Sequence, residues 1–239
     1  MYNVSAVIVA GGSGNRMQMQ GNKVYLPLDG FPILFHTLSV FEACELINEL
    51  IVVVPTEEID FCRKTVIEPL RISNALKITA GGKERQDSVR CGLRETSANC
   101  DLVVVHDGAR PLLTLGLLEA VIKEACTCGA AIAAVPVKDT IKIADAQGFV
   151  VDTPARDMLW SVQTPQAFRK DILVAAHDFA QAKGILATDD ASLVEKLGVP
   201  VKIVFGEYDN IKITTPEDVH IAGATFSRRR EAGESRHRL

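Results

Sequence analysis

The chain has 239 residues, of which 47% are hydrophobic and 23% charged, and its formal net charge is −4. This balance excludes an intrinsically disordered chain, and no apolar run approaches the roughly 18 residues that a membrane span needs. Residues 227–239 hold five Arg and two Glu, which leaves about −7 on the remainder and argues against a nucleic-acid-binding protein, because that class needs a basic face. No secretory signal pattern precedes the first apolar run, so we expect a cytoplasmic protein that binds neither membrane nor nucleic acid.

Apolar, β-branched runs alternate with amphipathic stretches along most of the chain. The apolar runs predict strands at residues 4–10, 50–54, 75–79, 102–106, 130–135 and 201–205. The amphipathic stretches predict helices at residues 33–43, 57–70, 85–95, 115–128 and 170–182, and Thr215-Pro216-Glu217-Asp218 is typical of a further helix start. Strands that are apolar almost throughout and are separated by helices indicate an α/β fold, in which a mostly parallel sheet is covered by helices on both faces.

Residues 138–156 break this alternation. Two short alternating segments, at 140–143 and 149–153, flank a turn at 145–148 and predict an inserted β-hairpin. A two-stranded hairpin is marginally stable alone in water, so it should pack against a partner subunit or, alternatively, against its own domain. We therefore expect one domain at residues 1–226 with the hairpin as an arm, followed by a basic, flexible tail at residues 227–239.

The first candidate site is the loop after the first strand, because parallel sheets bind ligands outside the carboxyl ends of their strands. This loop reads Ala10-Gly11-Gly12-Ser13-Gly14-Asn15-Arg16, and its glycines allow backbone N–H groups to approach an anion. It is neither a P-loop nor a dinucleotide fingerprint, since Met17 stands where the last glycine of the latter should be. With Arg16 and Lys23 beside it, the loop suits a nucleoside triphosphate; the alternative is an ordinary turn with two surface cations.

Two further strands end in polar loops. Ala80-Gly81-Gly82-Lys83-Glu84-Arg85 opens a helix, and the hydroxyl of Ser88 in that helix can read the edge of a base. His106-Asp107-Gly108-Ala109-Arg110 places a carboxylate that suits Mg²⁺ next to a guanidinium that suits a phosphate. The alternative is an Asp–Arg ion pair at the end of the strand. We expect His106 to be a packed side chain rather than a catalyst.

In this order, the motifs resemble those of the 2-C-methyl-D-erythritol 4-phosphate cytidylyltransferases (the IspD family) of the non-mevalonate isoprenoid route. The resemblance extends from residue 4 to about residue 224. Besides the three loops, it includes the segments 136–140, 163–166, 188–192 and 210–212, and Arg156.

The resemblance implies a Rossmann-like fold, a homodimer formed through the hairpin arm, and transfer of CMP from CTP to methylerythritol phosphate with Mg²⁺ present. Matched by position, the residues acting on the reacting phosphates would be Arg16, Lys23, Lys212 and, from the partner's hairpin, Arg156. Those holding CTP would be Ala10, Gly11, Gly12, Ser13, Gly14, Gly81, Gly82, Arg85 and Ser88. Those around the sugar phosphate would be Asp107, Arg110, Thr140, Thr164 and Thr188, with Asp107 also facing the metal. A ribitol-5-phosphate cytidylyltransferase is the nearest alternative, and a non-catalytic nucleotide-binding domain is a more distant one.

Overall fold

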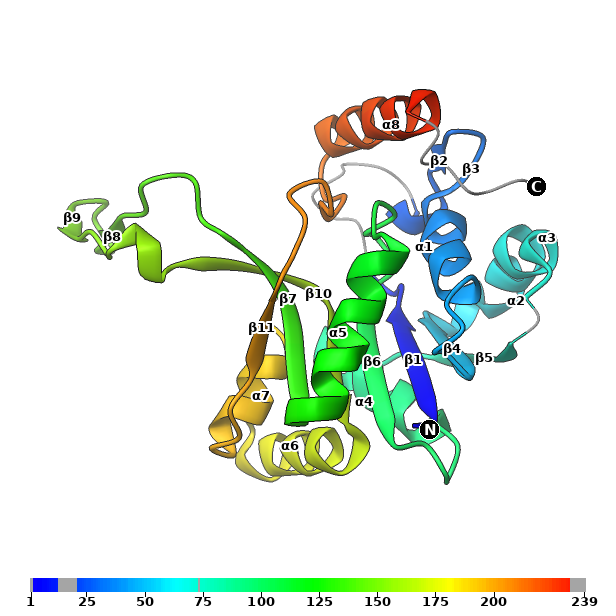
Figure 1. Ribbon diagram of the computed structural model, residues 1–239, viewed down its shortest axis with the longest axis horizontal. Coiled ribbons are helices and arrows are strands. Elements are labelled where there is room, and N and C mark those ends of the chain that lie inside the picture. Colours follow the sequence, from blue (N-terminus) through cyan, green and yellow to red (C-terminus); the bar gives the residue numbers. More distant parts are fainter. Residues whose placement is uncertain (1, 13–20, 73, 233–239) are drawn as a thin grey trace.

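A seven-stranded sheet forms the centre of the protein in a computed structural model that describes residues 2–12, 21–72 and 74–232. The strand order is β11-β7-β10-β6-β1-β4-β5 (Figure 1). The strands are β1 (Val4–Val9), β4 (Glu49–Val54), β5 (Ala75–Ala80), β6 (Leu102–Asp107), β7 (Ala130–Pro136), β10 (Trp160–Arg169) and β11 (Lys202–Phe205). All share one direction except β10, which is antiparallel to both of its neighbours. The prediction of a mostly parallel α/β sheet is confirmed.

Helices cover both faces of this sheet, as predicted. The helices of one face are α1 (Ile33–Glu42) and α5 (Leu115–Cys128); those of the other are α4 (Arg85–Glu95), α6 (Lys170–Lys183) and α7 (Asp190–Lys196). Alternate residues of β1 point to the two faces, so Ile8 packs in the cluster of α1 and α5 while Val7 packs in the cluster of α4, α6 and α7. Every residue of β1 is buried, which explains the unbroken apolar run.

Short elements complete the described chain. A small hairpin is formed by β2 (Pro27–Leu28) and β3 (Phe31–Pro32), and η2 (Lys23–Tyr25) is one 3-10 turn before it. The helix expected at 57–70 is divided into η3 (Thr56–Glu58), α2 (Ile59–Cys62), the π-helical η4 (Arg63–Ile67) and α3 (Glu68–Leu70). The wide π turn ends two residues before Pro69, whose ring and missing N–H are incompatible with a regular α-helix interior. No helix in the described ranges is both long and apolar enough to cross a membrane.

The central strand β10 was not expected from the sequence. It lies between β6 and β7, although Pro165 within it cannot donate a ladder hydrogen bond and would ordinarily argue against a central strand. The structure accommodates the proline at a register shift in the pairing with β7, between Val162 and Gln166. The peptide bond before Pro165 is cis. The short helix α7 was also missed; Asp189 caps it by accepting from the Ser192 backbone N–H.

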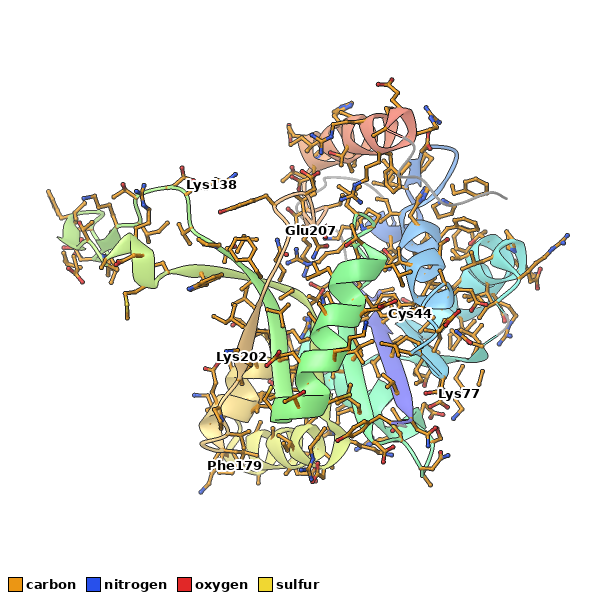
Figure 2. All side chains as sticks on the ribbon, in the orientation of Figure 1. Cys44, Lys77, Lys138, Phe179, Lys202 and Glu207 are labelled. Carbon is orange, nitrogen blue, oxygen red and sulfur yellow. The ribbon has the colours of Figure 1, made fainter. Side chains whose placement is uncertain are left out.

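The hairpin projects from the body as a long arm (Figure 1). Its strands, β8 (Ile143–Ala144) and β9 (Val150–Asp152), are shorter than expected, and η5 (Arg156–Met158) follows them. The turn between the strands is held by the Gly148 N–H, which donates to the Asp145 carbonyl at 3.1 Å. All residues of the arm from 138 to 153 are exposed, and Lys138 marks the place where it leaves the body (Figure 2). The arm therefore does not fold back onto its own domain.

The last helix, α8 (Pro216–Glu231), corrects one predicted boundary. It continues through residues 227–231, which were expected to belong to the flexible tail. Two interactions of its last turns explain this: Arg228 pairs with Asp209, and Arg229 donates to the Leu112 carbonyl at 2.9 Å. Residues 233–239 lie outside the described residues.

Candidate active site

A cleft of about 440 Å³ opens at the carboxyl ends of β1, β5 and β6. This is the edge at which a parallel sheet brings its strand-end loops together. The residues lining the cleft are Val9, Ala10, Gly11, Gly12, Lys23, Val24, Gly82, Lys83, Glu84, Arg85, Ser88, Asp107, Ala109, Lys212 and Thr214.

The loop between β5 and α4 forms one wall and has no space for side chains at its two glycines. A Cβ on Gly81 would lie 2.7 Å from the Ser88 hydroxyl oxygen, and a Cβ on Gly82 would lie 2.3 Å from the Cβ of Asp87. The Gly82 N–H donates to Ser88 Oγ at 3.2 Å, and Glu84 with Asp87 forms the capping box that starts α4. The loop is therefore a fixed wall of backbone and hydroxyl groups that can contact a nucleotide closely.

Lys23 lies on a turn that is fastened to the end of β1. The neighbouring Asn22 donates from Nδ2 to the Ala10 carbonyl at 2.5 Å and to Glu58 at 2.9 Å. Its Oδ1 accepts from the Val24 N–H at 3.3 Å, which caps the 3-10 turn. These bonds hold the start of the turn against the Gly11-Gly12 loop, so the backbone of Lys23 is fixed beside the glycines.

Asp107, the last residue of β6, is the centre of a cluster of cations. Its Oδ1 lies 3.0 Å from Arg85 Nε, and its Oδ2 lies 2.7 Å from Lys212 Nζ and 3.9 Å from Arg110 Nε. Burial tends to raise the pKa of Asp107, but Arg85, Lys212 and Arg110 hold it well below its ordinary value. Asp107 is therefore ionised at neutral pH. The ion pair expected as an alternative with Arg110 is present, but Arg85 and Lys212 are the closer partners.

The backbone around Asp107 is fixed by β10 and by the loop after β11. The Asp107 N–H donates to Thr164 Oγ1 at 3.1 Å, and Asn210 donates to the Thr164 carbonyl at 2.9 Å. Arg110 in turn donates to the Asn210 carbonyl at 2.7 Å. Thr164 and Arg110 thus act behind the cleft, where they support Asp107.

The Lys212 side of the cleft is held by α8. Asp218 in the first turn of α8 accepts from the N–H groups of Thr214 and Thr215, each at 2.8 Å, and from the Thr214 hydroxyl at 2.9 Å. The Ile213 N–H donates to the Ala109 carbonyl at 2.8 Å, which joins the Lys212 loop to the loop after β6. The segment that follows Lys212 is therefore fixed both to α8 and to the loop after β6.

His106 is a packed side chain, as expected. It is fully buried, and its ring lies 5.2 Å from that of Phe41. Burial lowers the pKa of His106 to about 3, so its ring is neutral at physiological pH.

The predicted site residues fall into four groups. Those lining the cleft are Ala10, Gly11, Gly12, Lys23, Gly82, Arg85, Ser88, Asp107 and Lys212. Those adjoining it through contacts with these residues are Gly81, Arg110 and Thr164. Those that are exposed and do not line the cleft of their own chain are Thr140, Arg156 and Thr188. Those outside the described residues are Ser13, Gly14 and Arg16.

The cleft is also lined by residues that were given no individual role in the sequence analysis, although Lys83, Glu84 and Ala109 lie in its candidate loops: Val9, Val24, Lys83, Glu84, Ala109 and Thr214. Glu84 could have been found from its position as the residue before α4. Thr214 lies two residues after Lys212, but its approach to the cleft depends on the placement of α8, which no local pattern gives.

A doubly covered α/β sheet with a glycine-walled, cation-rich cleft at its strand ends is typical of nucleotide-binding α/β proteins. A family model described as "2-C-methyl-D-erythritol 4-phosphate cytidylyltransferase" matches residues 4–228. The chain belongs to this family.

Relatives and solved structures agree with this placement. A 2-C-methyl-D-erythritol 4-phosphate cytidylyltransferase from Pelotomaculum thermopropionicum is 51% identical, over 96% of this chain and 96% of its own length. One from Caldanaerobacter subterraneus is 49% identical over 92% and 97%, respectively. The 4-diphosphocytidyl-2C-methyl-D-erythritol synthase of Anaerococcus prevotii superimposes with a TM-score of 0.85 at 34% identity, covering 95% of this chain and 97% of that one.

Proposed function

We propose that this chain transfers CMP from CTP to 2-C-methyl-D-erythritol 4-phosphate and releases pyrophosphate. One observation carries the proposal: the glycine walls, Lys23 and the Asp107–Lys212 pair line a single cleft. A site of this kind can hold a nucleotide at one end and a second phosphate at the other.

The order of the strands supports a direction for the two substrates. The Gly81-Gly82 loop follows β5 at one end of the cleft, and Asp107 follows β6 beyond β1 and β4. In the proposed arrangement, the cytidine lies against Gly82 and Ser88, and the triphosphate lies along Gly11, Gly12 and Lys23. The acceptor phosphate then lies near Lys212, so the two phosphates meet between Lys23 and Lys212.

The reaction needs positioning and charge compensation more than a base. An oxygen of the acceptor phosphate attacks the α-phosphorus of CTP, and the bond from that phosphorus to the β-bridging oxygen breaks, so pyrophosphate leaves with the bonding electrons. The attacking monoester has a second pKa of roughly 6 and is largely dianionic at neutral pH, so no proton has to be removed. Lys23 and Lys212 offset the repulsion between the two anions, and Arg16 is proposed to act with them.

Mg²⁺ fits the cleft as a counter-ion of the nucleotide rather than as a resident ion. The described residues contain no group of three or more side chains that could hold a metal, and both oxygens of Asp107 already pair with Arg85 and Lys212. The ligands of the ion would therefore be mainly phosphate oxygens and water, and a direct contact with Asp107 would require one of its ion pairs to open. When bound, the ion neutralises part of the triphosphate charge.

A homodimer formed through the arm is part of the proposal. Large apolar side chains are exposed on the arm and on the neighbouring strands, among them Phe149 (72%), Met158 (78%) and Phe205 (63%). Exposed apolar groups on a projecting hairpin are typical of an interface, which supports pairing with a second copy. Arg156 and Thr140, which are remote from their own cleft, would then reach the cleft of the partner. The cytoplasm is the proposed compartment, and the six free cysteines are in keeping with a reducing one.

Pyrophosphate release in the presence of CTP and Mg²⁺ tests the proposed reaction. We expect turnover with methylerythritol phosphate and only background release without an acceptor. Turnover with ribitol 5-phosphate alone would replace the proposed acceptor, and no turnover with either would remove the proposed reaction.

A further inference from the structure

A chain of ionic contacts connects the helices on one face of the sheet to the cleft. His177 Nε2 in α6 lies 3.0 Å from Asp190 Oδ1 at the start of α7, and Asp190 Oδ2 lies 2.8 Å from Arg85 Nη1. Arg85 Nε lies 3.0 Å from Asp107 Oδ1, whose second oxygen holds Lys212 at 2.7 Å. His177 and Asp190 are therefore linked to Lys212 through successive contacts that pass through Arg85 and Asp107.

Asp190 and His177, at the far end of this series of contacts, are buried, and Asp190 is charged. The side chains of Asp190 and His177 are each 1% exposed. Burying a carboxylate costs free energy unless the group is paired with a cation and hydrogen-bonded. Arg85 and His177 supply the ion pair and the hydrogen bonds to Asp190. Burial tends to raise the pKa of Asp190, but Arg85 and His177 hold it below its ordinary value, so it is ionised. Because a carboxylate only accepts, His177 Nε2 is the donor in this contact.

Asp190 does not contact Asp107 or Lys212, but it affects their positions through Arg85. The guanidinium of Arg85 is clamped between two carboxylates, with Nε on Asp107 and Nη1 on Asp190. Without the charge of Asp190, Arg85 loses the closer of these two anchors and can turn about Asp107. Any movement of Asp107 is passed to Lys212, since the same carboxylate binds both cations.

We propose that Asp190, oriented by His177, is a positioning residue that holds Arg85, Asp107 and Lys212 in the arrangement that the acceptor phosphate requires. The inference rests on the proposed function, in which Lys212 serves the acceptor. It also gives Arg85, expected to bind CTP, the different task of linking two carboxylates.

The substitution Asp190→Asn tests this role because it removes the charge at nearly constant volume. We expect kcat/KM for methylerythritol phosphate to fall at least about tenfold, while the Kd for CTP, measured by calorimetry, stays within about twofold of the wild-type value. Asp178→Asn, at an exposed position of α6, is the matched control and should leave both quantities unchanged. An unchanged kcat/KM, or an equal loss of CTP binding, would overturn the positioning role.

A double-mutant cycle separates action through Lys212 from independent action. In a Lys212→Ala background, Asp190→Asn should lower the remaining kcat/KM by less than about threefold, because the residue it positions is gone. A repeat of the full tenfold loss would show that Asp190 does not act through Lys212 and would contradict the inference. The wild-type rate is measured first, so failure of the proposed reaction is recognised before any variant is compared.

His177 provides a test that does not depend on how Asp190→Asn folds. Glutamine can place an N–H near the position of Nε2, whereas leucine of similar size cannot. We expect His177→Gln to retain at least about five times the kcat/KM of His177→Leu, with CTP binding alike in both. Equal rates for the two variants would rule out orientation of Asp190 by His177.

Discussion

Lys23 is the single residue on which the proposed chemistry depends most directly among those described. It lines the cleft beside Gly11 and Gly12, on a turn that Asn22 fastens to the Ala10 carbonyl. Lys23→Ala is expected to lower kcat at least about a hundredfold, the scale for loss of one preorganised charge stabiliser. Steady-state pyrophosphate release measures this, and Lys123→Ala, on the exposed side of α5, is the matched loss of charge elsewhere. A near-normal kcat in Lys23→Ala would remove it from the catalytic role.

His106 provides a prediction about stability and pH. Its folded pKa of about 3 lies below the ordinary value near 6.5, so its contribution is complete above pH 6.5 and is lost as the pH falls toward the folded pKa. Between pH 7 and pH 5.5, wild type should therefore lose about 1 kcal/mol of unfolding free energy more than His106→Gln. Urea unfolding at the two pH values measures the difference. Parallel losses in both proteins would contradict a buried, neutral His106.

Among the elements, the arm is the one that we propose acts on a second copy of the chain. Its exposed apolar side chains and the distance of Arg156 from its own cleft lead to a mixing experiment. Arg156→Ala and Lys23→Ala subunits are each expected to be weakly active alone. In a mixed dimer, one cleft has both an intact Lys23 and an intact partner arm, so an equal mixture should recover up to about a quarter of wild-type activity. No recovery in isolated heterodimers would mean that Arg156 does not act across the interface.

Elements differed in how well the sequence predicted them. The helices α4 and α5 begin and end at the residues expected, because α4 starts at the capping box of Glu84 and Asp87 and α5 has a periodic apolar face between Thr114 and Gly129. Strand β10 was missed because Pro165 and its polar neighbours obey no strand pattern, and only the neighbouring strands make it central. Local patterns predict an element well when its stability is local, and poorly when packing decides.

The arrangement of the whole molecule explains which site residues could be predicted from the sequence. Asp107 and Gly82 were predictable, since the carboxyl ends of parallel strands must meet at one edge. Asp190 and His177 were given no role, because their link to the cleft passes through Arg85 and requires the packing of α4, α6 and α7 together. Arg16 lies outside the described residues, and its role stays a prediction. The sequence thus predicts the residues that line the cleft more readily than the residues that hold those side chains in place.

Acceptor choice is a property of the whole molecule, and a competition between two acceptors measures it directly. CTP, Mg²⁺ and equal concentrations of methylerythritol phosphate and ribitol 5-phosphate are mixed with the wild-type protein, and the cytidine diphosphate products are separated and quantified by mass spectrometry. We expect that the methylerythritol product predominates and that pyrophosphate forms in equal amount to the total product. A predominance of the ribitol product, or nucleotide cleavage without either product, would contradict it.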